Sequence, residues 1–115
     1  MSAAKGIEIP LRSQAEFYVG SSIQFRATDL PRAVFPTFLA RCAKRGVELK
    51  WFGADAPLAY TSRYDSWAYL EDIPHLPGTH AALDKTIDMR IPLTFNCDDC
   101  DVIANIIVDE VISAA

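Results

Sequence analysis

The feature that most constrains this chain is an amphipathic helix pattern that stops at a single glycine, Gly46. The apolar residues recur at the spacing of one helix face: Val34, Phe35, Phe38, Leu39 and Cys42. Asp29 is a suitable N-cap, and Gly46 can take the left-handed conformation in which many helices end. We therefore predict a helix over residues 31–45. Its start should be irregular, because Pro36 kinks the helix if it lies beyond the first turn.

Strand patterns lie on both sides of this helix. Apolar residues alternate with polar ones before and after it, as in strands with one buried face. They are Ile23, Phe25 and Ala27 in residues 20–28, and Val47, Leu49 and Trp51 in residues 47–53. A shorter alternating segment, residues 7–11, contains Pro10 and is therefore limited to a sheet edge.

The second half of the chain predicts two more helices and a strand. Thr79 is a candidate N-cap for a helix over residues 79–88, with Ala82, Leu83, Thr86 and Ile87 on its buried face. A short strand over residues 89–94 follows. Asn96 and Asp99 then form a variant of the capping box at the start of the last helix. The buried face expected for that helix consists of Val102, Ile103, Ile106, Ile107 and Val111.

The order of these elements indicates an α+β fold. A chain of 115 residues suits one domain, which we divide into an N-terminal arm (residues 1–19) and an α+β domain (residues 20–115). We expect a small two-layer sandwich, with helices packed on one face of a mainly antiparallel sheet of three or more strands. Residues 53–78 are rich in aromatic side chains and proline; we expect mainly a loop there, with a short helix over residues 65–70.

Charge and hydropathy exclude several classes of function. A net charge of −4 and scattered basic residues argue against a nucleic-acid partner, because phosphate binding needs clustered lysine and arginine. The sequence has no apolar run of about 20 residues, so we expect no membrane partner. Three cysteines, an odd number, and an N-terminus without a signal-peptide pattern favour a cytoplasmic protein.

Cys97 and Cys100 form the most conspicuous short motif. Two thiols three residues apart at a helix N-terminus could be redox-active, or could supply half of a zinc site. The aspartates between them oppose thiolate formation, and no second ligand pair accompanies them. A structural first turn of the helix is the favoured interpretation. His75 and His80 flank a Pro-Gly turn and should face solvent.

The aromatic segment contains a candidate anion-binding side chain, Arg63. Three aromatic residues lie near it in sequence: Tyr60, Tyr64 and Trp67. A guanidinium in such a setting can bind a carboxylate or phosphate through two hydrogen bonds while the rings exclude water. The alternative is a surface loop that its own aromatic side chains hold against the core.

The strand at residues 21–28, the helix at residues 31–45 and the sequence Arg-Gly-Val-Glu-Leu-Lys-Trp-Phe-Gly at residues 45–53 together resemble a known family. They look like the C-terminal small domain of fold-type-I pyridoxal-phosphate aminotransferases, and most of all the DegT/StrS group of sugar aminotransferases. The later order of a helix, an Ile-Pro-Leu strand and a capped final helix is similar too. The resemblance covers roughly residues 20–113 and rests on the order and spacing of short motifs.

The resemblance implies a function in substrate recognition rather than in the chemical step. The family's large domain, which carries the lysine that forms an imine with the cofactor, is not identifiable in these residues. We therefore expect no catalytic residue in this chain, and pyridoxal phosphate only in a complete enzyme. The resemblance implies substrate contacts from Arg63, Tyr64, Trp51, Arg26 and Arg90. The implied partner is a large aminotransferase domain.

Two other classes of function stay open at this stage. The chain could be a stand-alone interaction module that forms a homo-oligomer through an apolar patch, which we would expect at residues 60–70. It could also be a CxxC thiol protein. Neither interpretation requires a metal.

Overall fold

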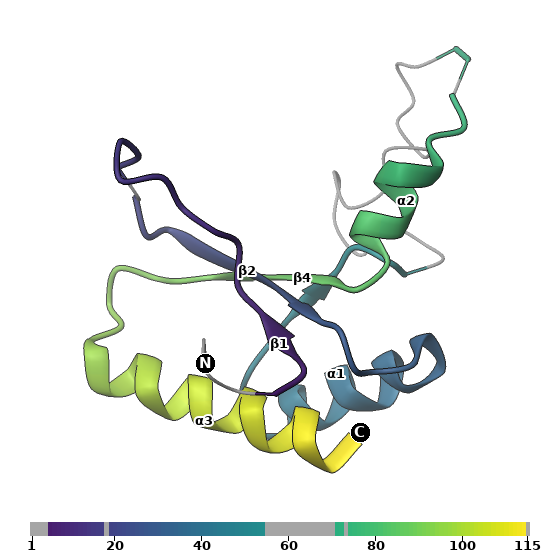
Figure 1. The fold of residues 1–115 in the computed structure, drawn as a ribbon. Helices are drawn as coiled ribbons and strands as arrows, with labels where there is room; N and C mark the ends of the chain where they lie inside the picture. Colours follow the sequence, from purple (N-terminus) through teal and green to yellow (C-terminus); the bar gives the residue numbers. More distant parts are fainter. Residues whose placement is uncertain (1–4, 18, 55–70, 73, 115) are drawn as a thin grey trace.

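The computed structural model describes residues 5–17, 19–54, 71–72 and 74–114 (Figure 1). A four-stranded antiparallel sheet has the strand order β1-β2-β4-β3. The strands are β1 (Ile7–Glu8), β2 (Ser22–Ala27), β3 (Lys50–Trp51) and β4 (Thr86–Arg90). The helices are the 3₁₀ turn η1 (Arg32–Val34), α1 (Phe35–Lys44), α2 (Pro77–Leu83) and α3 (Cys97–Ala114).

The helices α1 and α3 lie side by side on one face of the sheet, as Figure 1 shows, and this confirms the predicted α+β fold. Their inward side chains meet those of the two central strands. The fully buried side chains include Phe25, Leu30, Phe35, Phe38, Cys42, Ile87, Ile107 and Val111. The opposite face of β2 and β4 carries Gln24, Arg26, Thr86 and Asp88, so the strands alternate as a sheet with one core face requires.

The start of α1 resolves the position of Pro36. A 3₁₀ turn precedes the helix, so Pro36 lies in the first turn of α1, where its missing N–H has no partner to lose. The predicted cap at Asp29 is wrong. Pro31 occupies the N-cap position of η1, and Val34 that of α1, and neither makes a side-chain cap hydrogen bond.

The end of α1 follows the prediction closely. Gly46 has φ of 89° and donates its N–H to the Ala43 carbonyl at 3.0 Å, while the Val47 N–H reaches the Cys42 carbonyl at 2.9 Å. These two hydrogen bonds form a Schellman motif, which satisfies carbonyls that the helix end leaves free. The chain then turns back toward the sheet, and Val47 is buried.

The boundary between α2 and β4 differs from the prediction. The helix begins at Pro77, inside the region expected to be loop, and ends at Leu83; residues 86–88, expected to be helical, belong to β4. Ala82, Leu83 and Thr86 are therefore not a buried helix face, and α2 buries none of its residues. Pairing with β2 and β3 on both sides outweighs the local helical pattern. The helix stands away from the sheet in Figure 1.

The capping box of α3 is confirmed. The Asp99 N–H donates to Asn96 Oδ1 at 2.9 Å, and the Asn96 N–H donates to Asp99 Oδ2 at 3.0 Å. Ile107 and Val111 are buried as predicted, but Val102 is 59% exposed. The C-terminal half of the helix therefore carries the fully buried contacts. The short helix expected at residues 65–70 lies outside the described residues.

Candidate functional site

A cavity opens where β3 separates from β4. The two strands pair only at Lys50 with Asp88 and at Trp51 with Ile87, whereas β4 pairs with β2 as far as Arg90. The chain before Lys50 therefore diverges from β4 instead of continuing the ladder. The space between them is about 650 Å³. Its lining consists of Ala43, Gly46, Val47, Glu48, Leu49, Lys50, Asp88, Met89, Arg90, Pro92, Phe95 and Ile103.

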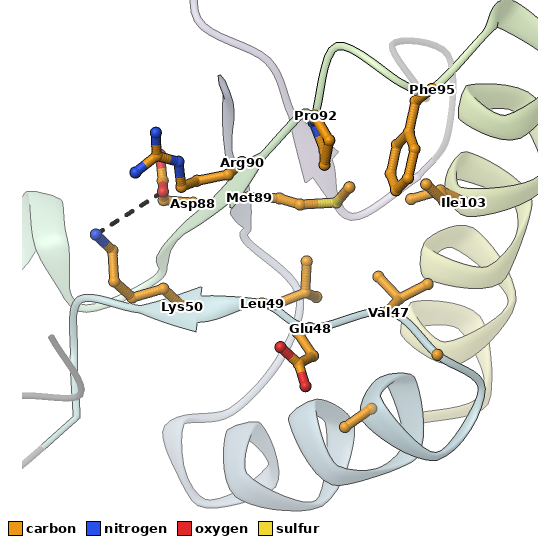
Figure 2. Close-up of a pocket in the computed structure, with 12 residues that line it drawn as sticks. Val47, Glu48, Leu49, Lys50, Asp88, Met89, Arg90, Pro92, Phe95 and Ile103 are labelled. Atoms are coloured by element: carbon orange, nitrogen blue, oxygen red, sulfur yellow. Dashed lines mark ion pairs between the residues drawn. The ribbon is translucent and has the colours of Figure 1, made fainter. Parts of the chain in front are cut away.

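The inner wall of this cavity is apolar. Figure 2 shows Leu49 pointing across the space toward Met89, whose side chain extends toward Phe95 and Ile103. Leu49 and Ile103 are half-buried, and Phe95 is 38% exposed. A partly exposed apolar wall of this kind is typical of a small-molecule site.

One end of the cavity is charged. Lys50 Nζ lies 3.8 Å from Asp88 Oδ2, and Gln24 Nε2 donates to Asp88 Oδ1 at 3.3 Å. Asp88 is only 7% exposed, so its carboxylate is held between these two partners. Arg90 follows on the same strand and is exposed, and its guanidinium makes no hydrogen bond or ion pair with any described residue. The mouth therefore has a guanidinium free to bind a ligand.

Trp51, a predicted substrate contact, lies in the core and is 6% exposed. Its ring stacks on Phe35 with 4.8 Å between centroids, and its Nε1 donates to the Asp84 carbonyl at 2.7 Å. The Arg32 guanidinium lies 5.0 Å from the centre of the Trp51 ring and also pairs with the Asp84 carboxylate. These contacts give Trp51 a packing role between β3, α1 and the end of α2. A role at a substrate-site mouth stays a prediction.

The two predicted arginines on the strands differ in their surroundings. Arg26 Nη1 lies 3.4 Å from Glu8 Oε2 on the neighbouring strand, so its charge is already partnered. Its Nε atom is buried without a hydrogen-bond partner. Thr86 of β4 pairs with Arg26. Arg90 lies four residues further along β4 and lines the cavity. Arg63 and Tyr64 lie outside the described residues.

The thiols of the CxxC motif lie in the first turn of α3, and both are exposed. In the part of the chain that the structure describes, no group of three or more histidine, cysteine, aspartate or glutamate side chains could hold a metal ion. His75 and His80 are exposed, as predicted. The described helices include none that is long and apolar enough to cross a membrane.

Sequence reasoning missed a charged cluster between α1 and α3. Glu110, 6% exposed, receives a hydrogen bond from Arg45 Nη1 at 3.0 Å. Arg41 Nε lies 2.8 Å from the other carboxylate oxygen, as a close ion pair without hydrogen-bond alignment. The hydrogen bond to Glu110 raises the pKa of Arg45. Burial, and next the charge of Glu110, raise the pKa of the adjacent Cys42 thiol to about 11.

The sequence contains a signal for this cluster that we did not use. Arg41 and Arg45 are four residues apart on one helix, so they share a face, and Glu110 interrupts the apolar pattern of another helix. A carboxylate in such a position needs a cationic partner. The cavity has no comparable signal, because it depends on where strand pairing stops.

Comparison with known proteins adds no relative to this description. No protein-family model matches the chain, and no curated protein or solved structure matches it significantly.

Proposed function

We propose that this chain is the small domain of a pyridoxal-phosphate aminotransferase of the DegT/StrS type. In that role it shapes the substrate site and a larger body supplies the reactive lysine. The observation that carries the proposal is the resemblance of residues 20–113 to that domain in the order of their motifs. The fold is compatible with it, because in the described part of the chain α1 and α3 cover one face of the antiparallel sheet.

Exposed apolar side chains support a larger body as the partner. Leu11, Phe17 and Val19, in the connection between β1 and β2, are 100%, 91% and 78% exposed. Leu93, in the connection between β4 and α3, is also fully exposed. In Figure 1 both connections lie at the same side of the molecule, away from α2. Exposed large apolar side chains on connections at one side of a molecule are compatible with a surface that packs against protein.

The described residues do not provide a site for the cofactor itself. Pyridoxal phosphate needs a lysine for the imine, an acidic partner for the ring nitrogen and an anchor for the phosphate. Lys85 Nζ donates to the Thr28 carbonyl at 2.7 Å, and Lys50 pairs with Asp88. Lys5 and Lys44 are exposed, and neither lines the cavity. We therefore assign the cofactor to the larger body and derive no chemical step in this chain.

Co-production tests the proposal. The chain is produced alone and together with the polypeptide that its neighbouring coding sequence encodes. We expect amino transfer to a sugar substrate only from the pair, because the imine lysine lies in the larger body. Amino transfer by the chain alone would contradict the division of labour. The absence of any association between the two polypeptides would contradict the proposed partner.

Arg63 provides a test at the level of one side chain. In the active pair, Arg63→Ala should raise KM for an anionic substrate by roughly tenfold or more, because an arginine–anion contact is a charge-assisted hydrogen bond. Arg12→Ala, which removes an exposed arginine paired with Glu16, is the matched control. Unchanged kinetics in Arg63→Ala would remove this residue from the substrate site.

The exposed apolar side chains also favour a second function, a self-associating interaction module. A homo-oligomer would cover Leu11, Phe17 and Val19 without any catalytic partner. Size-exclusion chromatography with light scattering distinguishes the two. A stable dimer that Phe17→Ser converts to a monomer would favour the module, whereas a monomer at high concentration would count against it.

A further inference from the structure

We propose that the cavity between β3 and β4 binds a small carboxylate with an apolar body. This inference does not depend on the aminotransferase proposal, because it rests only on the described residues around the cavity. A volume of about 650 Å³ falls within the range of small-molecule sites, about 300–1,000 Å³.

The pairing register shows why the cavity exists. If β3 continued toward its N-terminus in the same register, Leu49 would lie opposite Met89, and Glu48 opposite Arg90. Opposite charges facing each other across strands attract, so continued pairing would be locally favourable. The structure has no such pairs, and instead Val47 turns into the core from the Schellman motif of α1. The end of α1 therefore draws the chain away from β4.

The charges at the mouth favour an anion. The buried Asp88 carboxylate is already partnered by Lys50 and Gln24, whereas Arg90 is exposed and has no partner among the described residues. Figure 2 shows the side chains of Lys50 and Arg90 at the same end of the cavity, near Asp88. Glu48 points toward α1 and away from Arg90 in that view. A guanidinium beside an ammonium group binds an anion such as a carboxylate through charge-assisted hydrogen bonds.

The body of the ligand must be apolar, because Leu49, Met89 and Ile103 line the wall beyond this charged end. Phe95, a further lining residue, is 38% exposed, so a ligand that covers its ring removes apolar surface from water. The ligand class that meets both requirements is a medium-chain carboxylate, with its head at Arg90 and its chain along Leu49 and Met89.

Calorimetric titration of the intact chain with monomeric octanoate tests the site. We expect one octanoate per chain. Octan-1-ol, which has the same chain without the charge, should bind about tenfold more weakly, and so should octylammonium, because neither forms a charge-assisted hydrogen bond with a guanidinium. Octylammonium binding equal to that of octanoate, or no octanoate binding, would overturn the inference.

Substitution of Arg90 locates the carboxylate. Arg90→Gln should weaken octanoate binding about tenfold and leave octan-1-ol binding unchanged. The matched control is Arg12→Gln, which makes the same charge change at an exposed arginine outside the cavity. Equal weakening in both variants would show non-specific attraction and overturn the site. Because Arg90 is exposed at the end of β4, we expect both variants to keep the circular dichroism spectrum of the parent chain.

Methyl signals in NMR test the position of the apolar chain without any variant. On addition of octanoate, the methyl signals of Met89 and Ile103 should shift. Those of Ile9, which lies by the opposite edge strand β1 and outside this cavity, should not. Shifts confined to Ile9 and its surroundings would place binding elsewhere and contradict the proposal.

Discussion

Two regions of the molecule are built in opposite ways. The packed layer, where α1 and the C-terminal half of α3 cover β2 and β4, is closed by buried side chains such as Phe38 and Ile107. The splayed edge, where residues 47–50 face residues 88–92, keeps a cavity of about 650 Å³. The packed layer holds the buried carboxylate of Glu110 with two arginines, whereas at the splayed edge Arg90 has no partner among the described residues.

The packed layer accounts for the stability of the fold, and the splayed edge is the region available for recognition of a ligand. Burial of apolar side chains and full pairing of charges stabilise a fold, so the packed layer is where the fold is determined. A free charge beside an apolar wall contributes little to folding and is available to a ligand. Gly46 connects the two regions, because the turn that ends α1 also directs the chain away from β4.

The largest expected effect is in the packed layer. Phe38 is fully buried and packs edge-to-face against Phe35 with ring centroids 6.5 Å apart. Phe38→Ala should lower the free energy of unfolding by about 3–5 kcal/mol, since it leaves a cavity under the sheet. Urea denaturation measures this loss. The neighbouring Thr37→Ala, at an exposed position, should change stability by no more than about 0.5 kcal/mol.

The same kind of truncation at the splayed edge should cost less. Leu49→Ala removes a half-buried side chain that faces the cavity, so we expect a loss of about 1–2 kcal/mol. Denaturation curves of the two variants, recorded side by side, test the contrast. A loss at Leu49 as large as that at Phe38 would show that the edge is part of the core.

The charged cluster should have a smaller effect still. Glu110→Gln keeps the shape of the side chain but removes its charge. We expect the free energy of unfolding to fall by about 1 kcal/mol. The loss is small because Arg41 and Arg45, the partners of Glu110, are half-exposed and solvent screens their charges. Asp109→Asn is the control, as Asp109 is 62% exposed and pairs only with Arg45 among the residues described. Equal losses would contradict the central role of Glu110.

A further effect concerns pH. The pKa of Cys42 is raised to about 11 from an ordinary value of 9.0, chiefly by burial. Between these values the folded chain holds the thiol proton that the unfolded chain releases, so this contribution is complete below pH 9 and is lost as pH rises toward 11. Urea denaturation at pH 8 and pH 10 should show a steeper loss for the parent chain than for Cys42→Ala. Identical pH dependence would contradict a buried, protonated thiol.

Local chemistry explains which parts of the fold the sequence could predict. The exit at Gly46 and the capping box of Asn96 and Asp99 depend on residues within one turn, and both are confirmed. The prediction that the helix continues through Thr86 was wrong, because pairing with strands on both sides makes this residue part of β4. Val102 fits a helical apolar face, but 59% of it is exposed.

The candidate site was predictable only in part. Arg90 could be identified as a cation near a strand end, but not as an arginine beside a cavity whose guanidinium has no partner in the described part of the chain. Arg26 has the same sequence context, and only the pairing of β1 with β2 brings Glu8 to it. Trp51 belongs to the sequence at residues 45–53 on which the resemblance partly rests, yet it stacks in the core on Phe35.

The most direct test of the central claim is the absorbance band of the pyridoxal imine. It is measured for the chain alone and for the chain co-produced with the polypeptide from its neighbouring coding sequence. We predict the band only in the co-produced complex, with loss of the band when the lysine of the larger body is replaced by alanine. A stoichiometric imine band from the chain alone would contradict the claim that this chain shapes a site whose reactive lysine lies elsewhere.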